Sequence, residues 1–157
     1  MPIIHFAPLR LRAGSVVEPG NWGRLLRTHE TFKTNDNKAL ATGAVAREYI
    51  FETERLKNFS HLPSRLSSCF ACPTLADADL YQPNAGNYWV RHEVEPDDPS
   101  APSHIGYLAY CTMNLAGPFL PDMTAKAASY WAGTLGDPQQ GKEVVYGCGL
   151  RIVKCLE

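Results

Sequence analysis

The chain has 157 residues, of which 45% are hydrophobic and 20% are charged, with 15 Lys and Arg against 16 Asp and Glu. This balance is typical of globular proteins and excludes intrinsic disorder. The formal charge of -1 provides no general attraction to nucleic acid or to anionic lipid. The length predicts a single domain over residues 1–157, built around one hydrophobic core.

The first residues lack the basic and apolar regions of a signal peptide, and no segment reaches the about 18 consecutive apolar residues of a membrane helix. We therefore expect a cytoplasmic protein with no membrane partner. Five cysteines, an odd number, favour reduced thiols over a disulfide framework. Cys69 and Cys72 have the spacing of a redox pair or a zinc knuckle, but no second ligand pair follows them. We favour small buried side chains and predict no metal site.

The first 38 residues are predicted to form short strands separated by turn-rich segments. Residues 2–7 are apolar and end at Pro8, which predicts a strand. Glycine and proline recur through 9–23, so we expect a structured loop with a short strand at 15–18. Residues 28–38 are polar and rich in turn formers, and we interpret them as a loop or a lid.

The segment 39–58 contains no proline, and its apolar residues recur at helical spacing. It is therefore predicted to be a helix. The side chains expected on its buried face are Val45, Tyr49, Leu56 and Phe59. Those expected on its wetter face are Arg47, Glu48, Glu52 and Arg55.

The middle of the chain alternates polar and apolar residues in two places. Residues 64–72 predict a strand that leads into a capped helix at 74–82, and 88–94 predict a second strand. A turn-rich loop follows at 96–102. The pattern over 104–115 is compatible with either a strand or irregular structure.

Three further elements are predicted in the last third. A helix over about 122–133 begins with an Asp or Thr cap and ends at Gly133. Residues 142–146 and 150–155 are β-rich, and the Gly-Cys-Gly sequence at 147–149 predicts a hairpin or tight turn between them. Helices and strands in this order indicate a mixed α and β fold.

Standard nucleotide, metalloprotease and hydrolase motifs are absent from the sequence. The candidate functional residues are instead a His in the first strand, an Arg in a small-polar segment and a Glu at the start of a late strand: His5, Arg65 and Glu143. Around them stand four short motifs. They are Ile4-His5-Phe6, the run from Pro63 to Phe70, Tyr130-Trp131-Ala132-Gly133, and Lys142-Glu143-Val144-Val145.

Through these motifs, which span most of its length, the chain resembles small bacterial and phage ADP-ribosyltransferase-like domains. The resemblance implies an α+β fold with a split mixed β-sheet core and flanking helices, and NAD as the substrate. It implies that His5 holds the adenosine ribose, that Ser67 or Ser68 lines the nicotinamide pocket and that Glu143 is catalytic. The second-strand position departs from the family pattern, since neither a Tyr nor a clear Ser-Thr-Ser can be placed there.

The chemistry of NAD cleavage suits these residue types. Breaking the nicotinamide–ribose bond builds positive charge on the ribose, which a carboxylate such as Glu143 stabilises. The guanidinium of Arg65 offers two-point contact with the pyrophosphate, and Phe70 or Tyr81 can stack on nicotinamide.

Each candidate also has an ordinary structural interpretation. A Glu at the start of a strand is commonly solvated, and a His at a strand end commonly has a structural partner. Arg65 can pair with Glu48 or Glu52 in place of a phosphate. Tyr130 and Trp131, at the end of a helix, are expected in the core.

The resemblance predicts transfer of ADP-ribose from NAD to a macromolecular acceptor, either protein or RNA or DNA. Small transferases of this type act as toxins or in phage conflict, so a cognate antitoxin or immunity protein is an expected partner. Two alternatives remain open. An NAD glycohydrolase would pass ADP-ribose to water, and a non-catalytic module would bind NAD or a partner without turnover.

Overall fold

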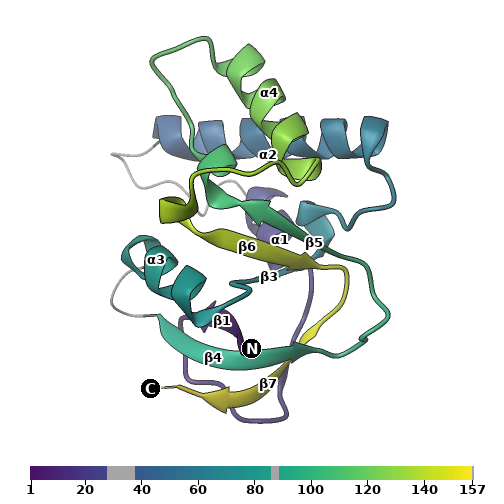
Figure 1. The fold of residues 1–157 in the computed structure, drawn as a ribbon, viewed down its shortest axis with the longest axis vertical. Helices are drawn as coiled ribbons and strands as arrows, with labels where there is room; N and C mark the ends of the chain where they lie inside the picture. Colours follow the sequence, from purple (N-terminus) through teal and green to yellow (C-terminus); the bar gives the residue numbers. More distant parts are fainter. Residues whose placement is uncertain (28–37, 86–88, 157) are drawn as a thin grey trace.

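The computed structural model describes residues 1–27, 38–85 and 89–156. Within these ranges the chain forms helices and two sheets, so the predicted α+β class is confirmed (Figure 1). Every strand pairing among these residues is antiparallel, so the predicted mixture of parallel and antiparallel strands is wrong. One sheet has the strand order β1-β4-β7-β2 and the other β3-β6-β5. The strands are β1 (Ile3–Ala7), β2 (Val16–Val17), β3 (Cys69–Ala71), β4 (Val90–Pro96), β5 (Ser103–Tyr107), β6 (Lys142–Tyr146) and β7 (Leu150–Cys155).

The two sheets meet where β1 passes the end of β3. Ile4 and Cys72 exchange backbone hydrogen bonds of 2.9 and 2.7 Å, which forms a single antiparallel bridge. The contact joins the sheets at one point, so strands β1, β3 and β6 lie next to one another in that order.

Helices cover the β3-β6-β5 sheet on one side and flank β1 on another (Figure 1). The helices are α1 (Asn21–Arg27), α2 (Lys38–Asn58), α3 (Leu75–Ala85) and α4 (Phe119–Trp131). Short 3₁₀ turns, η2 (Arg65–Ser67), η3 (Leu108–Cys111) and η4 (Pro138–Gln140), connect them to the strands. Helices α2 and α4 pack on each other above β5 and β6, and both chain ends lie beside the other sheet.

Alternation along the strands divides the core in two. Phe70 and Val145 project toward α2 and α4 and contact the cluster of Phe51, Met123, Ala127, Tyr130 and Trp131. We call this the helix face of β3 and β6. On the opposite side, the sheet face, Ala71 and Val144 pack with residues of β4 and β7: Val94, Leu150 and Ile152.

Several predicted elements are confirmed. Strands occupy the predicted segments at 2–7, 15–18, 142–146 and 150–155, and α2 coincides with the predicted helix. The ambiguous segment 104–115 begins in β5 and continues into η3. Apart from Lys38, the loop or lid predicted at 28–38 lies outside the described residues.

The strand predicted at 64–72 is wrong in its first half. Only Cys69–Ala71 are extended, whereas Arg65–Ser67 form a 3₁₀ turn. The Ser64 hydroxyl caps this turn by accepting a hydrogen bond from the backbone N–H of Leu66 at 3.2 Å. Local capping by a serine thus prevails over the alternating pattern.

The cap predicted for the late helix is also wrong. Helix α4 starts earlier, at Phe119 after Pro118, without a side-chain cap. Nor do β6 and β7 form a hairpin, because the turn at 147–149 carries the chain from one sheet to the other. Strand partners are chosen by the core that each strand buries, which the short turn does not encode.

The buried face of α2 differs from the predicted one. Glu48, Phe51 and Arg55 are buried, while Tyr49 and Leu56 are 62% and 60% exposed. These charged residues can occupy the inner face because each has a partner there: Glu48 pairs with Arg65, and Arg55 bonds Glu52 and the carbonyls of Ser60 and Leu62. The apolar spacing, read alone, selected the wrong side of the helix.

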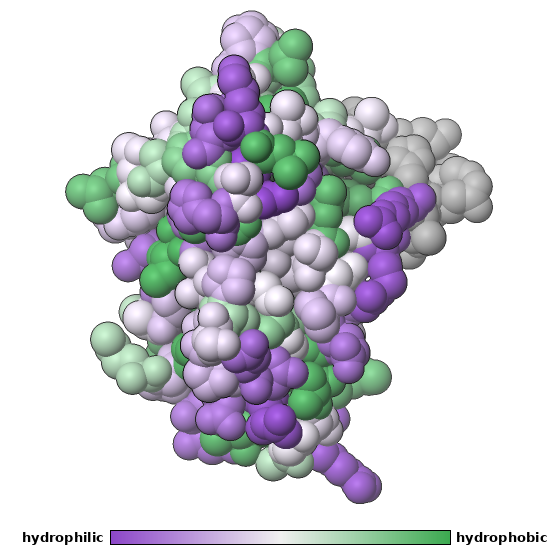
Figure 2. Space-filling model, turned by 90° about the vertical axis from the view of Figure 1, so that its right-hand side faces the viewer, coloured by the Kyte–Doolittle hydropathy of each residue, from purple (hydrophilic) through white to green (hydrophobic). Residues whose placement is uncertain are grey.

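All five cysteines lie in the described part of the chain, and none forms a disulfide. Cys69 and Cys72 are buried as predicted, whereas the other three are partly exposed. Among the described residues, no helix is long and apolar enough to cross a membrane, and no group of three His, Cys, Asp or Glu side chains could hold a metal ion. On the side of the molecule shown in Figure 2, hydrophobic residues are scattered among hydrophilic ones.

Candidate functional site

Glu143 lies on the helix face of β6, opposite Gly106 of β5. A Cβ atom at Gly106 would lie 2.0 Å from the ring of Tyr130, so only glycine lets that ring cover the strand. In this position the Tyr130 hydroxyl donates a 2.8 Å hydrogen bond to Oε1 of Glu143. Close approach of α4 to β5 therefore places a phenol beside the carboxylate.

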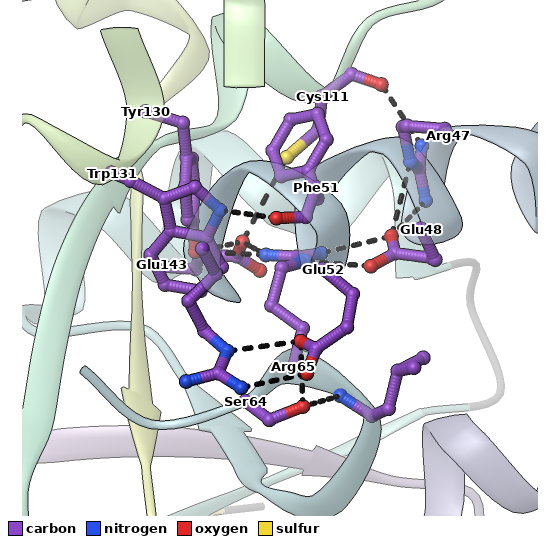
Figure 3. A network of polar contacts seen from close by, with 12 residues as sticks. Arg47, Glu48, Phe51, Glu52, Ser64, Arg65, Cys111, Tyr130, Trp131 and Glu143 are labelled. Carbon is purple, nitrogen blue, oxygen red and sulfur yellow. Dashed lines mark hydrogen bonds and ion pairs between the residues drawn. The ribbon is translucent and has the colours of Figure 1, made fainter. Parts of the chain in front are cut away.

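Arg65, from the turn η2, extends into the same place and is 5% exposed. Its Nε and Nη2 donate to Oε2 and Oε1 of Glu48 at 2.8 and 3.2 Å. Its Nη1 donates to the Tyr130 hydroxyl at 2.8 Å and pairs with Oε1 of Glu143 (Figure 3). One guanidinium thus joins two carboxylates that come from a helix and a strand.

Aromatic rings surround this guanidinium. Its central carbon lies 4.9 Å from the ring centroid of Phe70, 5.1 Å from that of Tyr130 and 5.5 Å from that of Phe51. Ring faces attract a cation and exclude water from it. They also fix the plane of the Arg65 fork, and with it the direction of the bonds to both carboxylates.

Glu48 is the most enclosed charged residue of the site, at 1% exposure. Besides Arg65, it receives hydrogen bonds from Nε and Nη2 of Arg47 at 3.1 and 2.8 Å, both on Oε1. Arg47 is itself held by the carbonyl of Cys111, which accepts from Nη1 at 2.9 Å. The described groups therefore form a chain in the order Arg47, Glu48, Arg65, Glu143.

Mutual compensation keeps Glu48 and Arg65 charged. Burial opposes the charge of Arg65, but the carboxylates of Glu143 and Glu48 hold its pKa well above the ordinary value. Burial likewise disfavours the Glu48 anion, yet Arg65 and Arg47 hold the pKa of that carboxyl below its usual value. Burial raises the pKa of Tyr130 well above its ordinary value; Arg65 opposes this shift and Glu143 adds to it, so the phenol stays a neutral donor.

The carboxylate of Glu143 is held on one side only. Oε1 receives Arg65 and Tyr130, and the Cys111 thiol lies 3.8 Å from it. Oε2 accepts no hydrogen bond from the described residues, and the side chain is 12% exposed. The site thus has a fixed, partly accessible carboxylate oxygen that could hydrogen-bond a ligand hydroxyl or stabilise a developing cation.

His5 does not share this site. Ile4 pairs with Cys72, so these two side chains lie on the helix-face side of the strands, and the next residue, His5, lies on the sheet-face side. The resemblance implies that His5 and Glu143 act on the same NAD molecule, but their side chains lie on opposite sides of the strands. Without knowing how two strands pair, the sequence cannot show which of their alternating side chains share a face of the sheet.

On its own side, His5 lines a cleft of about 310 Å³ with residues of β2 and the loop before it. Its Nδ1 lies 2.8 Å from the carbonyl oxygen of Phe70, which accepts the hydrogen bond. Burial lowers the pKa of His5, partly opposed by that carbonyl, so the imidazole is neutral near pH 7. Leu11 and Val17, which also line the cleft, belong to the core between the sheets.

The remaining predicted residues are divided. Ser67 is exposed, whereas Ser68 is buried and its Oγ has no hydrogen-bond partner in the described part of the chain. Phe70 packs against Arg65, and Tyr81 packs edge-on against Phe6 with ring centroids 5.3 Å apart. Burial and then the charge of Glu143 raise the pKa of Tyr81.

The alternative weighed for Arg65, an ion pair with Glu48, is the one that the structure shows. Four hydrogen bonds occupy its guanidinium, which leaves little capacity for a pyrophosphate. Sequence reasoning assigned Glu48 to a solvated face and Tyr130 to the core alone. The helical spacing of Glu48, Phe51 and Arg55 places them on one face of α2, and this spacing could have indicated a shared buried face. The pairing of Glu48 with Arg65, which explains why a carboxylate is buried there, is visible only in the structure.

Comparison with known protein families gives a match over part of the chain. A family model described as "Protein of unknown function (DUF2441)" matches residues 24–100. That segment contains Glu48 and Arg65 but neither His5 nor Glu143. No curated protein matches the chain.

Proposed function

We propose that the protein cleaves NAD and transfers ADP-ribose to a macromolecular acceptor, with Glu143 as the catalytic carboxylate. The observation that carries the proposal is the one-sided anchoring of Glu143, whose Oε1 is held by Arg65 and Tyr130 while Oε2 accepts no hydrogen bond from the described residues. The resemblance of the Lys142–Val145 segment to ADP-ribosyltransferase-like domains, with two small sheets that meet at β1 and β3, supports it.

In this proposal the bond between the ribose C1′ and the nicotinamide nitrogen breaks, and nicotinamide leaves with the bonding electrons. An acceptor nucleophile then bonds to C1′ and loses its proton to solvent. Oε2 of Glu143 accepts a hydrogen bond from a ribose hydroxyl and stabilises the positive charge that develops on the ring. Because Oε1 is already fixed, the carboxylate does not have to reorient as that charge forms.

The roles of Arg65 and His5 change accordingly. Arg65 orients Glu143 and does not hold the pyrophosphate, since its N–H groups already face two carboxylates and a phenol. His5 faces the opposite side of the strands, so the proposal does not require it to contact the same NAD molecule. Of the two aromatic residues, Tyr81 is the better candidate for nicotinamide stacking, because Phe70 already covers Arg65.

The test is turnover of labelled NAD in the presence of whole-cell lysate. We expect wild-type protein to release nicotinamide and to label an acceptor. Loss of the label on protease digestion identifies a protein acceptor, and loss on nuclease digestion identifies a nucleic acid. Glu143→Gln keeps the shape and removes the charge, so turnover should fall by at least about 100-fold. The matched control is Glu95→Gln, an exposed Glu of β4, which should leave turnover unchanged.

Two results would contradict the proposal. Equal turnover by wild type and Glu143→Gln would remove Glu143 from the mechanism. Free ADP-ribose as the sole product would replace the transferase with an NAD glycohydrolase that uses the same carboxylate.

A second candidate is a non-catalytic module. The buried ion pair between Arg65 and Glu143 favours it, because such a pair is also a structural device that fixes one packing of α2, α4 and β6. Under this alternative, calorimetric titration detects NAD or partner binding without nicotinamide release, and Glu143→Gln lowers the thermal stability instead of turnover.

A further inference from the structure

The charge balance around Arg65 singles out Glu48, which lies on the far side of the guanidinium from Glu143. The buried chain contains two guanidiniums and two carboxylates: Arg47, Arg65, Glu48 and Glu143. Glu48 receives hydrogen bonds from both guanidiniums, whereas Glu143 receives one from the guanidinium of Arg65 and one from the neutral Tyr130 hydroxyl. Without the charge of Glu48, the four-residue chain would hold two guanidiniums and only the single carboxylate of Glu143.

We infer that Glu48 is a positioning residue for the proposed reaction: it fixes the guanidinium of Arg65 and neutralises its charge, so that Glu143 can act on a developing cation. This inference rests on the proposed function. Glu48 does not touch the substrate, because it is 1% exposed and enclosed by Arg47 and Arg65.

Geometry supports the positioning role. Two hydrogen bonds of 2.8 and 3.2 Å from Nε and Nη2 to Glu48 define the plane of the Arg65 fork, which leaves Nη1 directed at Tyr130 and Glu143. Helix α2 holds Glu48 one turn before Phe51, whose ring packs beside the guanidinium. A rotation of Arg65 would therefore shift the anchor of Glu143.

Electrostatics supports it as well. In a buried site, a positive charge next to the reacting ribose raises the energy of the cationic transition state. Glu48 compensates this charge, at the cost of enclosing its own carboxylate. A hydrophobic residue at this position would fill the space but leave Arg65 paired with Glu143 alone.

The experiment compares Glu48→Gln with Glu52→Gln in the full chain. Glu52 is the matched control, because it lies one turn further along α2 and pairs with Arg55 and Ser64 instead of Arg65 (Figure 3). For Glu48→Gln we expect kcat for NAD to fall roughly 10- to 100-fold with KM nearly unchanged. For Glu52→Gln we expect wild-type kcat and KM at temperatures well below the melting transition.

Glu48→Asp separates charge from packing. It restores the negative charge with a shorter side chain, so it should recover part of the kcat lost in Glu48→Gln. If Glu48→Asp is as slow as Glu48→Gln, the inference that the negative charge of Glu48 compensates Arg65 is overturned. If Glu48→Gln does not fold, Glu48→Asp alone should still show a lower kcat at unchanged KM, and an unchanged kcat would overturn the inference.

A second measurement is independent of activity. The ¹³C signal of the Glu143 carboxyl carbon, observed by NMR, should shift in Glu48→Gln and stay in place in Glu52→Gln. If the ¹³C chemical shift of Glu143 is the same in Glu48→Gln as in the wild type, the inference is overturned. A wild-type protein that does not turn over NAD overturns the proposed function instead, so the two failures are distinguishable.

Discussion

The helix face and the sheet face of the central strands bury polar groups in different ways. On the helix face, Arg65 and Glu48 remain charged, because each has an opposite partner within hydrogen-bond distance. On the sheet face, His5 is partly buried in its neutral form and donates a hydrogen bond to the carbonyl of Phe70. The comparison teaches that burial permits a charge only where a compensating charge is built in, and otherwise selects the neutral form.

The strongest way to break the helix face is to remove its central cation. Arg65→Met fills the space but leaves Glu48 and Glu143 buried without their shared partner, so we expect a loss of about 3–5 kcal/mol in the free energy of unfolding. Urea denaturation measures it. The control is Lys154→Met, which removes a largely exposed pair with Glu93 and should cost less than about 1 kcal/mol.

A loss in Arg65→Met no larger than in Lys154→Met would show that the buried network is not what holds α2 to β6.

A smaller change on the same face is Tyr130→Phe. The ring stays over Gly106, but the hydroxyl that bridges Arg65 and Glu143 is lost. We expect a destabilisation of about 1–3 kcal/mol, because buried donors and acceptors lose a partner. Chemical denaturation checks it, and an unchanged midpoint would mean that the bridge contributes nothing to folding.

The sheet face should respond to pH. Burial lowers the pKa of His5 in the folded state. Below the unfolded value of about 6.5, the imidazole is therefore protonated in the unfolded chain but still neutral in the folded one. The stability contribution of neutral His5 is therefore complete above that pH and is lost as pH falls toward the folded pKa. His5→Gln should flatten the fall in unfolding free energy between pH 7 and pH 5.

His61→Gln is the matched control for this effect, since His61 is exposed. Its stability should follow the wild-type pH dependence. His104, whose pKa is also lowered by burial, accounts for part of the slope that remains in His5→Gln. Parallel curves for wild type and His5→Gln would show that His5 is not held neutral by the fold.

The sequence determined the α+β class, most of the helices and strands, and the presence of a carboxylate at the start of β6. These features follow from local patterns: alternation in strands, helical spacing without proline, and glycine at turns. It also offered the pair of Arg65 with Glu48 as one of two interpretations. Such local signals act over a few residues, which is why they can be predicted without the tertiary structure.

Only the tertiary structure decided which residues share a site. Glu48, Arg65 and Glu143 are 17 and 78 residues apart along the chain and meet because α2, η2 and β6 pack together. His5 lies on the opposite face because of a single bridge between Ile4 and Cys72, and β6 and β7 join different sheets despite the short turn between them. The face on which a side chain lies, and the strand with which its own strand pairs, depend on how the strands pack into the common core. That packing is a property of the whole molecule and not of a few neighbouring residues.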